Sequence, residues 1–215
     1  MSDSIYYITI FAIAYLIGSI PWGFILAKMN GIDIRQHGSG NIGATNVLRT
    51  LGKKWGIPCF ILDFIKGLAP VVVVNLLIAS ETIPESAHLS TVIAALGTVF
   101  GHVYTIFLKF KGGKGIATSA GCLIALAPYP LLIALIIWVA FFYSTRYVSL
   151  ASIVAAGALP INAFICNTVG MGTAASGAEI LLLSLLGLLA IYRHKSNITK
   201  LLNGTENRFE KKQSA

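Results

Sequence analysis

Residues 38–49 read GSGNIGATNVLR, a polar stretch in which three glycines alternate with hydrogen-bonding side chains. It follows an apolar segment that is long enough to cross a bilayer. Glycine accepts positive φ, which lets backbone N–H groups turn towards a bound anion, and Ser, Thr, Asn and Arg add donors for phosphate oxygens. The stretch therefore predicts an anion-binding loop. The side chains expected to contact the anion are those of Ser39, Asn41, Thr45, Asn46 and Arg49.

A second polar stretch, residues 109–119, reads KFKGGKGIATS and surrounds Lys114 with glycines. The apolar run 116–127 is expected to be a helix, so its N-terminal N–H groups and the Lys114 ammonium would meet at one place. That combination predicts a phosphate site. Its expected contacts are Lys109, Lys111, Gly112, Gly113, Lys114 and Gly115.

Neither stretch is a nucleotide-binding motif. Gly115 follows Lys114 where a Walker loop has Ser or Thr, and no glycine stands five residues before Gly113. The pattern GxGxxG at residues 38–43 follows a membrane segment and not a strand, so it does not support a dinucleotide-binding fold.

The third polar stretch, residues 193–206, reads RHKSNITKLLNGTE and follows the last apolar segment. His194 and Asn197 are three residues apart and would share one face of a helix. From the residues alone, His194 could be a general base, a phosphate ligand or an interfacial side chain. Glu206 is expected to be a structural partner of a nearby Lys or Arg.

Two charged residues and a histidine fall inside apolar segments. Asp63 and Lys66 have i, i+3 spacing, and Asp63 would lie about 12 Å from the start of its helix at Trp55. Inserting such charges costs about 2.5–3.5 kcal/mol each, so we expect them to pair beside the polar site. His102 is expected to be an ordinary core histidine, and His37, next to the first stretch, is a weak site candidate.

The overall composition is that of a membrane protein. Hydrophobic residues make up 56% of the 215 residues, charged residues 11%, and the mean hydropathy is +0.79, whereas about 25% charged residues is usual in soluble domains. No linker or repeat divides the chain, which predicts one domain over residues 1–215. Cys59, Cys122 and Cys166 lie far apart in apolar surroundings and are expected to be buried thiols, not disulfide partners or metal ligands.

The apolar runs predict an all-α membrane bundle with seven transmembrane helices. Pro21 is expected to kink the first helix. The two runs on either side of Pro128 and Pro130 are short for a bilayer, so they would be two steep short helices or a re-entrant hairpin. The predicted runs are 5–27, 55–79, 89–108, 116–127, 131–143, 148–166 and 180–192.

The distribution of basic residues predicts the orientation of the chain. Asp3 precedes the first run where a signal peptide would be basic, so we expect a retained helix with its N-terminus outside. With seven crossings, fifteen of the sixteen Lys and Arg residues fall inside the cell, and the remaining one, Lys66, lies within a segment. All three polar stretches and the C-terminus would then be cytoplasmic, and the stretches would form one composite site.

In order and spacing, the three stretches resemble the motifs of the bacterial acyl-phosphate:glycerol-3-phosphate acyltransferase family, over the whole chain. The resemblance implies a seven-helix enzyme of the bacterial inner membrane that makes lysophosphatidic acid on the cytoplasmic face. It implies important roles for Ser39 and Arg49, a glycerol 3-phosphate loop around Lys114, and catalytic roles for His194 and Asn197. The implied partners are glycerol 3-phosphate, acyl phosphate and membrane lipid, with the enzyme that supplies acyl phosphate as a further candidate and no nucleic acid.

An acyl phosphate carries its own leaving group, so such an enzyme chiefly has to hold two anions together and align the sn-1 hydroxyl with the carbonyl. Two proton acceptors stay open: His194 oriented by Asn197, or a substrate phosphate oxygen. Ser39 as an acyl-enzyme nucleophile is a weaker route, because no His-Asp pair in the sequence would activate it. Direct transfer, with Ser39 hydrogen-bonded to phosphate, is favoured.

Other functions fit the residues less well. No histidine is followed five residues later by Asp, as the HxxxxD signature of thioester-dependent acyltransferases requires, so a coenzyme A donor is disfavoured. A CDP-alcohol phosphotransferase needs a cluster of metal-binding aspartates, whereas the expected cytoplasmic loops offer only Asp33, so neither metal nor cofactor is expected. The alternative from another class is a transporter of a phosphorylated anion, which would also need polar residues on the outer side.

Overall fold

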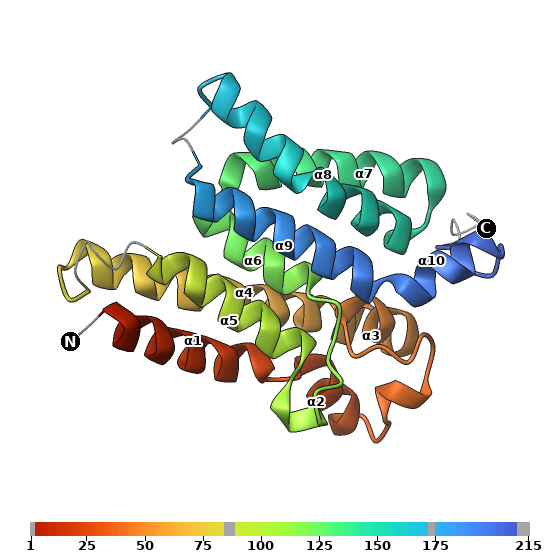
Figure 1. Ribbon diagram of the computed structural model, residues 1–215. Coiled ribbons are helices and arrows are strands. Elements are labelled where there is room, and N and C mark those ends of the chain that lie inside the picture. Colours follow the sequence, from red (N-terminus) through yellow and green to blue (C-terminus); the bar gives the residue numbers. More distant parts are fainter. Residues whose placement is uncertain (1–2, 84–88, 172–174, 210–215) are drawn as a thin grey trace. The chain divides into compact units, whose positions relative to one another are not determined.

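The computed structural model describes residues 3–83, 89–171 and 175–209, and every regular element in these ranges is a helix (Figure 1). The helices form two compact units, Met1–Leu126 and Ala127–Ala215. The predicted all-α class is confirmed, whereas the single domain over the whole chain stays a prediction.

The first unit holds the first two polar stretches. α3, α5 and α6 all pack on α4, which is therefore the common support of both stretches. The α-helices of the unit are α1 (Asp3–Ser19), α2 (Trp22–Met29), α3 (Ala44–Leu51), α4 (Lys53–Ala79), α5 (Ser90–Val103) and α6 (Ile116–Leu126), with 3-10 turns at Ile34–Gln36 and Ile106–Leu108.

The first apolar run is broken near Pro21, as predicted. α1 ends at Ser19, because proline has no N–H group for an intrahelical bond and its ring clashes with the preceding turn. The backbone carbonyls at this break are hydrogen-bonded by side chains from other helices. Thr105 Oγ1 donates to the Ser19 oxygen at 2.5 Å, and Lys66 Nζ donates to the Ile20 oxygen at 2.7 Å.

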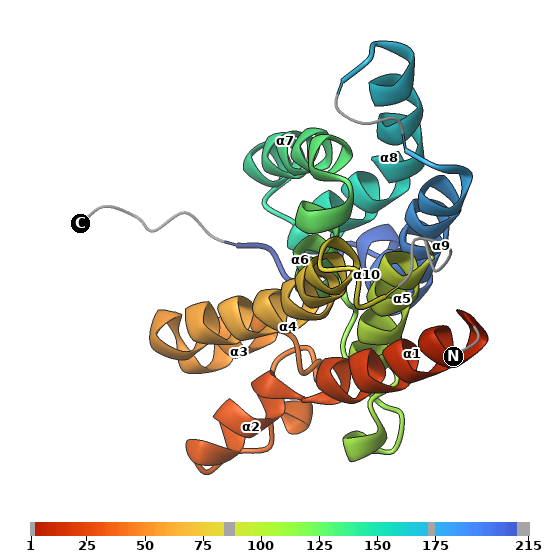
Figure 2. The same ribbon diagram turned by 90° about the vertical axis from the view of Figure 1, so that its left-hand side faces the viewer.

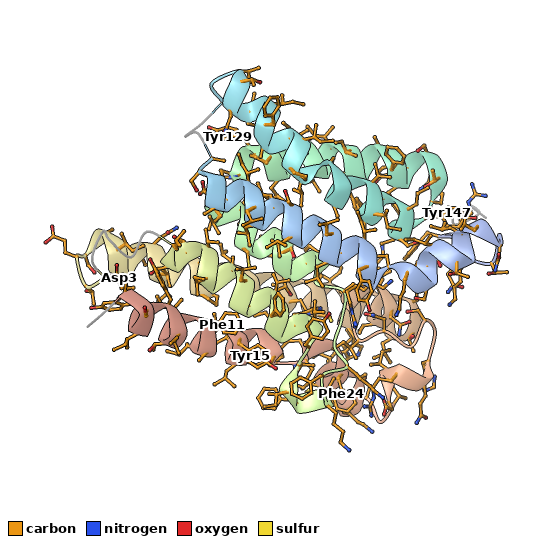
Figure 3. All side chains as sticks on the ribbon, in the orientation of Figure 1. Asp3, Phe11, Tyr15, Phe24, Tyr129 and Tyr147 are labelled. Carbon is orange, nitrogen blue, oxygen red and sulfur yellow. The ribbon has the colours of Figure 1, made fainter. Side chains whose placement is uncertain are left out.

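α1 and α5 pack side by side through small residues (Figure 2). Gly97 and Gly101 of α5 face the α1 backbone so closely that a methyl group on Gly97 would lie 2.7 Å from the Phe11 carbonyl oxygen. Such pairs of small residues let helix backbones approach each other in membranes. Tyr15, labelled with Phe11 in Figure 3, donates from its hydroxyl to the Tyr104 carbonyl oxygen at 2.7 Å. This contact holds the end of α5, after which the second polar stretch follows.

The second unit holds the third polar stretch, and its described residues form four helices, α7 (Pro128–Thr145), α8 (Val148–Thr168), α9 (Gly177–Arg193) and α10 (Lys195–Leu202). α8 packs on both α7 and α9. The prediction of two short helices around Pro128 and Pro130 is wrong for one of them: α6 has 11 residues, but α7 has 18. Both prolines lie in the first turn of α7, where a missing N–H breaks no intrahelical bond, so they begin the helix instead of interrupting it.

In the part of the chain that the structure describes, five helical stretches are long and apolar enough to cross a membrane, and a sixth results if α9 and α10, which meet at 55°, count as one span. α6 is a shorter apolar helix. The predicted apolar runs are thus helical over most of their length in the described residues, while the count of seven crossings and the orientation stay predictions. The five stretches are Asp3–Met29, Lys53–Ala79, Ser90–Leu108, Pro128–Thr145 and Val148–Thr168.

Candidate active site

The first polar stretch is organised around the buried side chain of Asn46. Its Oδ1 accepts the Ser39 N–H at 2.9 Å, and its Nδ2 donates to the carbonyl oxygens of His37 at 3.0 Å and Asn41 at 2.8 Å. Nδ2 also lies 3.3 Å from the Ile34 carbonyl oxygen. Asn46 is only 2% exposed, so its amide shapes the loop from within.

The backbone of this loop has the left-handed turns expected of glycine at Gly38 and Gly40, whose φ values are +58° and +70°. Gly43, with φ −75°, precedes α3, whose N-terminus has no side-chain cap. Asn41 Oδ1 accepts the Gly43 N–H at 2.8 Å, and Thr45 lies in the first turn of α3. The loop therefore ends at a helix N-terminus, a type of position that favours anions.

The second polar stretch folds back on the end of α5. The N–H groups of Gly112 and Gly113 donate to the carbonyl oxygens of Val103 and His102, both at 3.1 Å. A methyl group on Gly113 would overlap with His102 Nε2, so any side chain at this position would displace the histidine ring. Gly115, with φ +84°, leads directly into α6.

Lys114 consequently stands between a fixed glycine pair and the N-terminus of α6, as the sequence predicted. Lys109 and Lys111 are exposed on the turn before the glycines. Lys109 and Phe110 have φ of +52° and +62°, which is uncommon for residues other than glycine, and the Phe110 N–H donates to the Thr105 carbonyl oxygen at 2.9 Å. The turn thus has a defined shape and carries two ammonium groups next to the glycine loop.

One hydrophobic cluster lies under both stretches. Ile42 of the first stretch belongs to it together with Leu108, which immediately precedes the second. Figure 1 shows the two connections, orange and yellow-green, at the same end of the unit. Arg49 lies in the last turn of α3, which contributes Val47 to the cluster. The structure therefore brings two of the three predicted stretches together. The buried members are Leu26, Ala27, Ile34, Ile42, Val47, Cys59 and Leu108.

Arg35, ahead of the first loop, is held by an acidic and an aromatic side chain. It binds Asp33 through two nitrogens, with Nε–Oδ1 at 2.9 Å and Nη2–Oδ2 at 2.6 Å. Its guanidinium carbon lies 4.8 Å from the centre of the Phe24 ring, which is labelled in Figure 3. The hydrogen bonds from Arg35 lower the pKa of Asp33 to about 2. Asp33 is therefore an ionised carboxylate that forms an ion pair with Arg35.

The third polar stretch lies in the second unit, where His194 forms the bend between α9 and α10. Its side chain is buried, and Nδ1 lies 2.7 Å from the Ala190 carbonyl oxygen. A carbonyl oxygen can only accept a hydrogen bond, so in the neutral ring Nδ1 carries the proton and Nε2 carries the lone pair. This is the tautomer that a base acting through Nε2 requires.

Asn197 and Glu206 form a buried polar cluster with Ser149 at the start of α8. Asn197 Nδ2 and Ser149 Oγ both donate to Glu206 Oε1, at 2.8 Å and 2.9 Å. The Asn197 N–H donates to the His194 carbonyl oxygen at 2.8 Å, which begins α10. Glu206 thus has a structural role, and the partners seen among the described residues are a serine and an asparagine, whereas the sequence suggested a basic residue.

Glu206→Ala is expected to destabilise the second unit. The change removes the acceptor of two buried donors, and an unsatisfied buried donor costs about 1–3 kcal/mol. The thermal unfolding temperature of the purified protein in detergent should therefore fall by several degrees. Glu206→Gln keeps a carbonyl oxygen for both donors and should unfold close to the wild-type temperature. Equal unfolding temperatures for all three proteins would contradict this role.

Two contacts of the third stretch could not be found by sequence reasoning. Ser149 is 57 residues from Glu206, and a serine in the first turn of an apolar helix is too common to indicate a partner. Ala190 acts through its backbone carbonyl, which every residue has. Only the i−4 spacing between Ala190 and His194 on a helix could have suggested the second contact.

The chain is similar to known proteins over nearly its whole length. The family model described as glycerol-3-phosphate acyltransferase matches residues 8–204. A protein named glycerol-3-phosphate acyltransferase from Geotalea daltonii is 46% identical, over 92% of this chain and 95% of its own. The protein of the same name from Aquifex aeolicus is 44% identical, over 91% of this chain and 95% of its own.

Two crystal structures of PlsY (YgiH), an integral membrane glycerol 3-phosphate acyltransferase, share this fold. The glycerol 3-phosphate form has a TM-score of 0.83 and 40% identity, covering 95% of this chain and 96% of that one. The lysophosphatidic acid form has a TM-score of 0.80 and 39% identity, covering 95% of each chain. The family match includes the first two polar stretches and residues 193–204 of the third. The chain therefore belongs to the glycerol-3-phosphate acyltransferase family of integral membrane proteins.

Proposed function

We propose that this protein transfers a fatty acyl group from an acyl phosphate to the sn-1 hydroxyl of glycerol 3-phosphate, with lysophosphatidic acid and inorganic phosphate as products. Membership of the family supports acyl transfer to glycerol 3-phosphate. The glycerol 3-phosphate and lysophosphatidic acid forms of the related crystal structures support this substrate and product. The proposal adds acyl phosphate as the donor and names the residues that act.

The observation that carries the proposal is the geometry of the glycine loop, residues 112–115. Hydrogen bonds of 3.1 Å hold Gly112 and Gly113 on the end of α5, so Lys114 and the first turn of α6 are held next to each other. We assign this place to the phosphate of glycerol 3-phosphate. Charge-assisted hydrogen bonds to such a dianion contribute about 1.5–3 kcal/mol each.

The first loop supplies a second set of donors, as two phosphorylated substrates require. Asn46 fixes the loop from within, and the Asn41 amide oxygen accepts the Gly43 N–H. We assign phosphate oxygens to Ser39, Thr45 and Arg49, because hydroxyl and guanidinium groups are suitable donors for them. Positive charge from both loops would offset the repulsion between two phosphates and stabilise the departing phosphate.

The proposed reaction is a direct displacement at the acyl carbonyl carbon. The sn-1 oxygen forms a bond to that carbon, the bond from carbon to the phosphate oxygen breaks, and its electron pair leaves with the phosphate. The hydroxyl proton goes to His194 Nε2, whose lone pair follows from the hydrogen bond between Nδ1 and the Ala190 carbonyl. Asn197 is held by Glu206 and fixes the turn that carries His194. No acyl-enzyme forms on Ser39.

We further propose the orientation that the basic residues predict, with the N-terminus outside, seven crossings of the bacterial inner membrane and all three polar stretches in the cytoplasm. α6, with 11 residues, would be the short crossing. The acyl chain would then lie in lipid or between helices, while both phosphates stay at the polar surface. The composite site of all three stretches stays part of this proposal.

The donor is tested by supplying the purified protein with glycerol 3-phosphate and either palmitoyl phosphate, palmitoyl-coenzyme A or the palmitoyl thioester of acyl carrier protein. Lysophosphatidic acid is expected with palmitoyl phosphate as the donor and with neither of the two thioesters. Its formation from a thioester but not from palmitoyl phosphate would contradict the proposed donor. Uptake of glycerol 3-phosphate into liposomes without any lysophosphatidic acid would instead indicate a transporter.

A further inference from the structure

Three ionisable side chains are buried together inside the first unit. Asp63 and Lys66 of α4 and His102 of α5 are 2%, 4% and 4% exposed. Lys66 Nζ lies 2.8 Å from Asp63 Oδ1, and His102 Nδ1 lies 3.7 Å from the same oxygen. Charges inside a membrane segment cost several kcal/mol each, which their pairing only partly returns. Apolar side chains at these positions would allow the helices to pack without the free-energy cost of burying charges.

His102 connects this ion pair with the glycine loop. Its Nδ1 faces the Asp63 carboxylate, and its Nε2 lies against Gly113, in the space that a methyl group on that glycine would need. The His102 carbonyl oxygen also accepts the Gly113 N–H at 3.1 Å. Both the ring and the backbone of His102 therefore hold the residue that precedes Lys114.

Lys66 connects the same ion pair with the break between α1 and α2. Its Nζ donates to the Ile20 carbonyl oxygen at 2.7 Å. α2 follows this break and contributes Leu26 and Ala27 to the hydrophobic cluster under the first loop. His102 thus contacts the glycine loop, whereas Lys66 contacts the break ahead of α2, the helix that packs in the cluster under the first loop.

We propose that Asp63, Lys66 and His102 are positioning residues for glycerol 3-phosphate, an inference that rests on the proposed function of the glycine loop. The ion pair fixes the His102 ring, and the ring fixes Gly113, so that Lys114 and the N-terminus of α6 meet the substrate phosphate. The three side chains act through the loop and do not touch the substrate. A displacement of about 1 Å at such a loop can cost about 100-fold in kcat/KM, so a rigid support has a large effect.

An ion pair that served stability alone would be replaceable. Buried ion pairs can often be exchanged for apolar side chains of similar volume without loss of stability, whereas removing one partner leaves an unpaired charge. The double variant Asp63→Leu with Lys66→Met makes such an exchange and removes the carboxylate from His102. It therefore separates a role in stability from a role in substrate binding.

The experiment measures kcat, KM for glycerol 3-phosphate at saturating palmitoyl phosphate, and thermal unfolding. The double variant is expected to fold, with an unfolding temperature lowered by no more than the loss of the hydrogen bond from Lys66 Nζ to the Ile20 carbonyl oxygen. It should raise KM about tenfold or more, with kcat changed less than about threefold. His102→Gln lacks the ring but keeps an uncharged polar group, and it is expected to raise KM similarly. If the double variant does not fold, His102→Gln provides the test. Thr98→Val is the control, because Thr98 is fully buried in α5 and its hydroxyl bonds within that helix. It should keep the wild-type KM.

A folded double variant with the wild-type KM would overturn the proposal, and so would a wild-type KM in His102→Gln. A lowered kcat with a wild-type KM in either variant would overturn the proposal as well, since the loop is assigned to substrate binding. Wild-type protein that forms no lysophosphatidic acid from glycerol 3-phosphate would refute the proposed function itself. The two failures are therefore distinguishable in one set of assays.

Discussion

His194→Ala is expected to lower kcat for lysophosphatidic acid formation by about 10²–10⁴-fold, the usual contribution of a positioned proton acceptor. KM for glycerol 3-phosphate should change little, because the proton moves only as the new ester bond forms. His194→Gln should be as slow as His194→Ala, because an amide nitrogen does not accept a proton near neutral pH. Steady-state assays at saturating palmitoyl phosphate measure both constants.

Thr199→Ala is the matched control for the His194 variants, because Thr199 is exposed on the same helix, α10, and its hydroxyl bonds to the Lys195 carbonyl oxygen. It should keep wild-type kinetics. The contrary result for His194→Ala is a raised KM with a nearly unchanged kcat. That result would make His194 a phosphate ligand and leave a substrate phosphate oxygen as the proton acceptor.

Gly113→Ala is expected to lower kcat/KM for glycerol 3-phosphate by about 10–100-fold. The added methyl group would occupy the space of His102 Nε2, so the ring or the loop has to move, and Lys114 moves with the loop. Most of the loss should appear in KM, because the loop is assigned to the substrate phosphate. The same steady-state assay measures this division.

Gly177→Ala is the matched control for this substitution, since a methyl group on Gly177 would meet no atom within 4 Å. It should have wild-type kcat and KM. Wild-type kinetics in Gly113→Ala would mean that the loop tolerates the displaced ring, and the assignment of the glycine loop to glycerol 3-phosphate would lose its geometric support.

Features that depend on residues close together in the sequence, such as apolar runs, prolines and glycine-rich stretches, could be predicted from it. Long apolar runs became helices because burial of their side chains does not depend on a particular partner. Pro21 ended α1, and both glycine-rich stretches lead into the N-termini of helices, α3 and α6. The prediction of a short helix after Pro128 and Pro130 was wrong because both prolines were treated as helix breakers. The same residue is favourable in a first turn, and the sequence does not say which case applies.

The roles of buried polar side chains were less predictable, because they depend on partners that only the fold brings together. Asn46 and Asn41 look alike in the sequence, yet Asn46 is bonded to the backbone at three or more positions of the loop, whereas one bond inside the loop is seen for the Asn41 side chain among the described residues. His102 was expected to be a core residue, and it is buried. The His102 ring lies between Asp63 and Gly113, which belong to two other segments, and no local sequence pattern indicates these contacts.

The proposed reaction is tested most directly by analysing the products of palmitoyl phosphate and glycerol 3-phosphate with the purified protein in lipid nanodiscs, by mass spectrometry and phosphate assay. Attack of the sn-1 hydroxyl at the carbonyl carbon should give lysophosphatidic acid and inorganic phosphate in equal amounts. Attack at phosphorus would instead give palmitate and a glycerol bisphosphate. That pair of products, or palmitate and phosphate without lysophosphatidic acid, would contradict the proposed function.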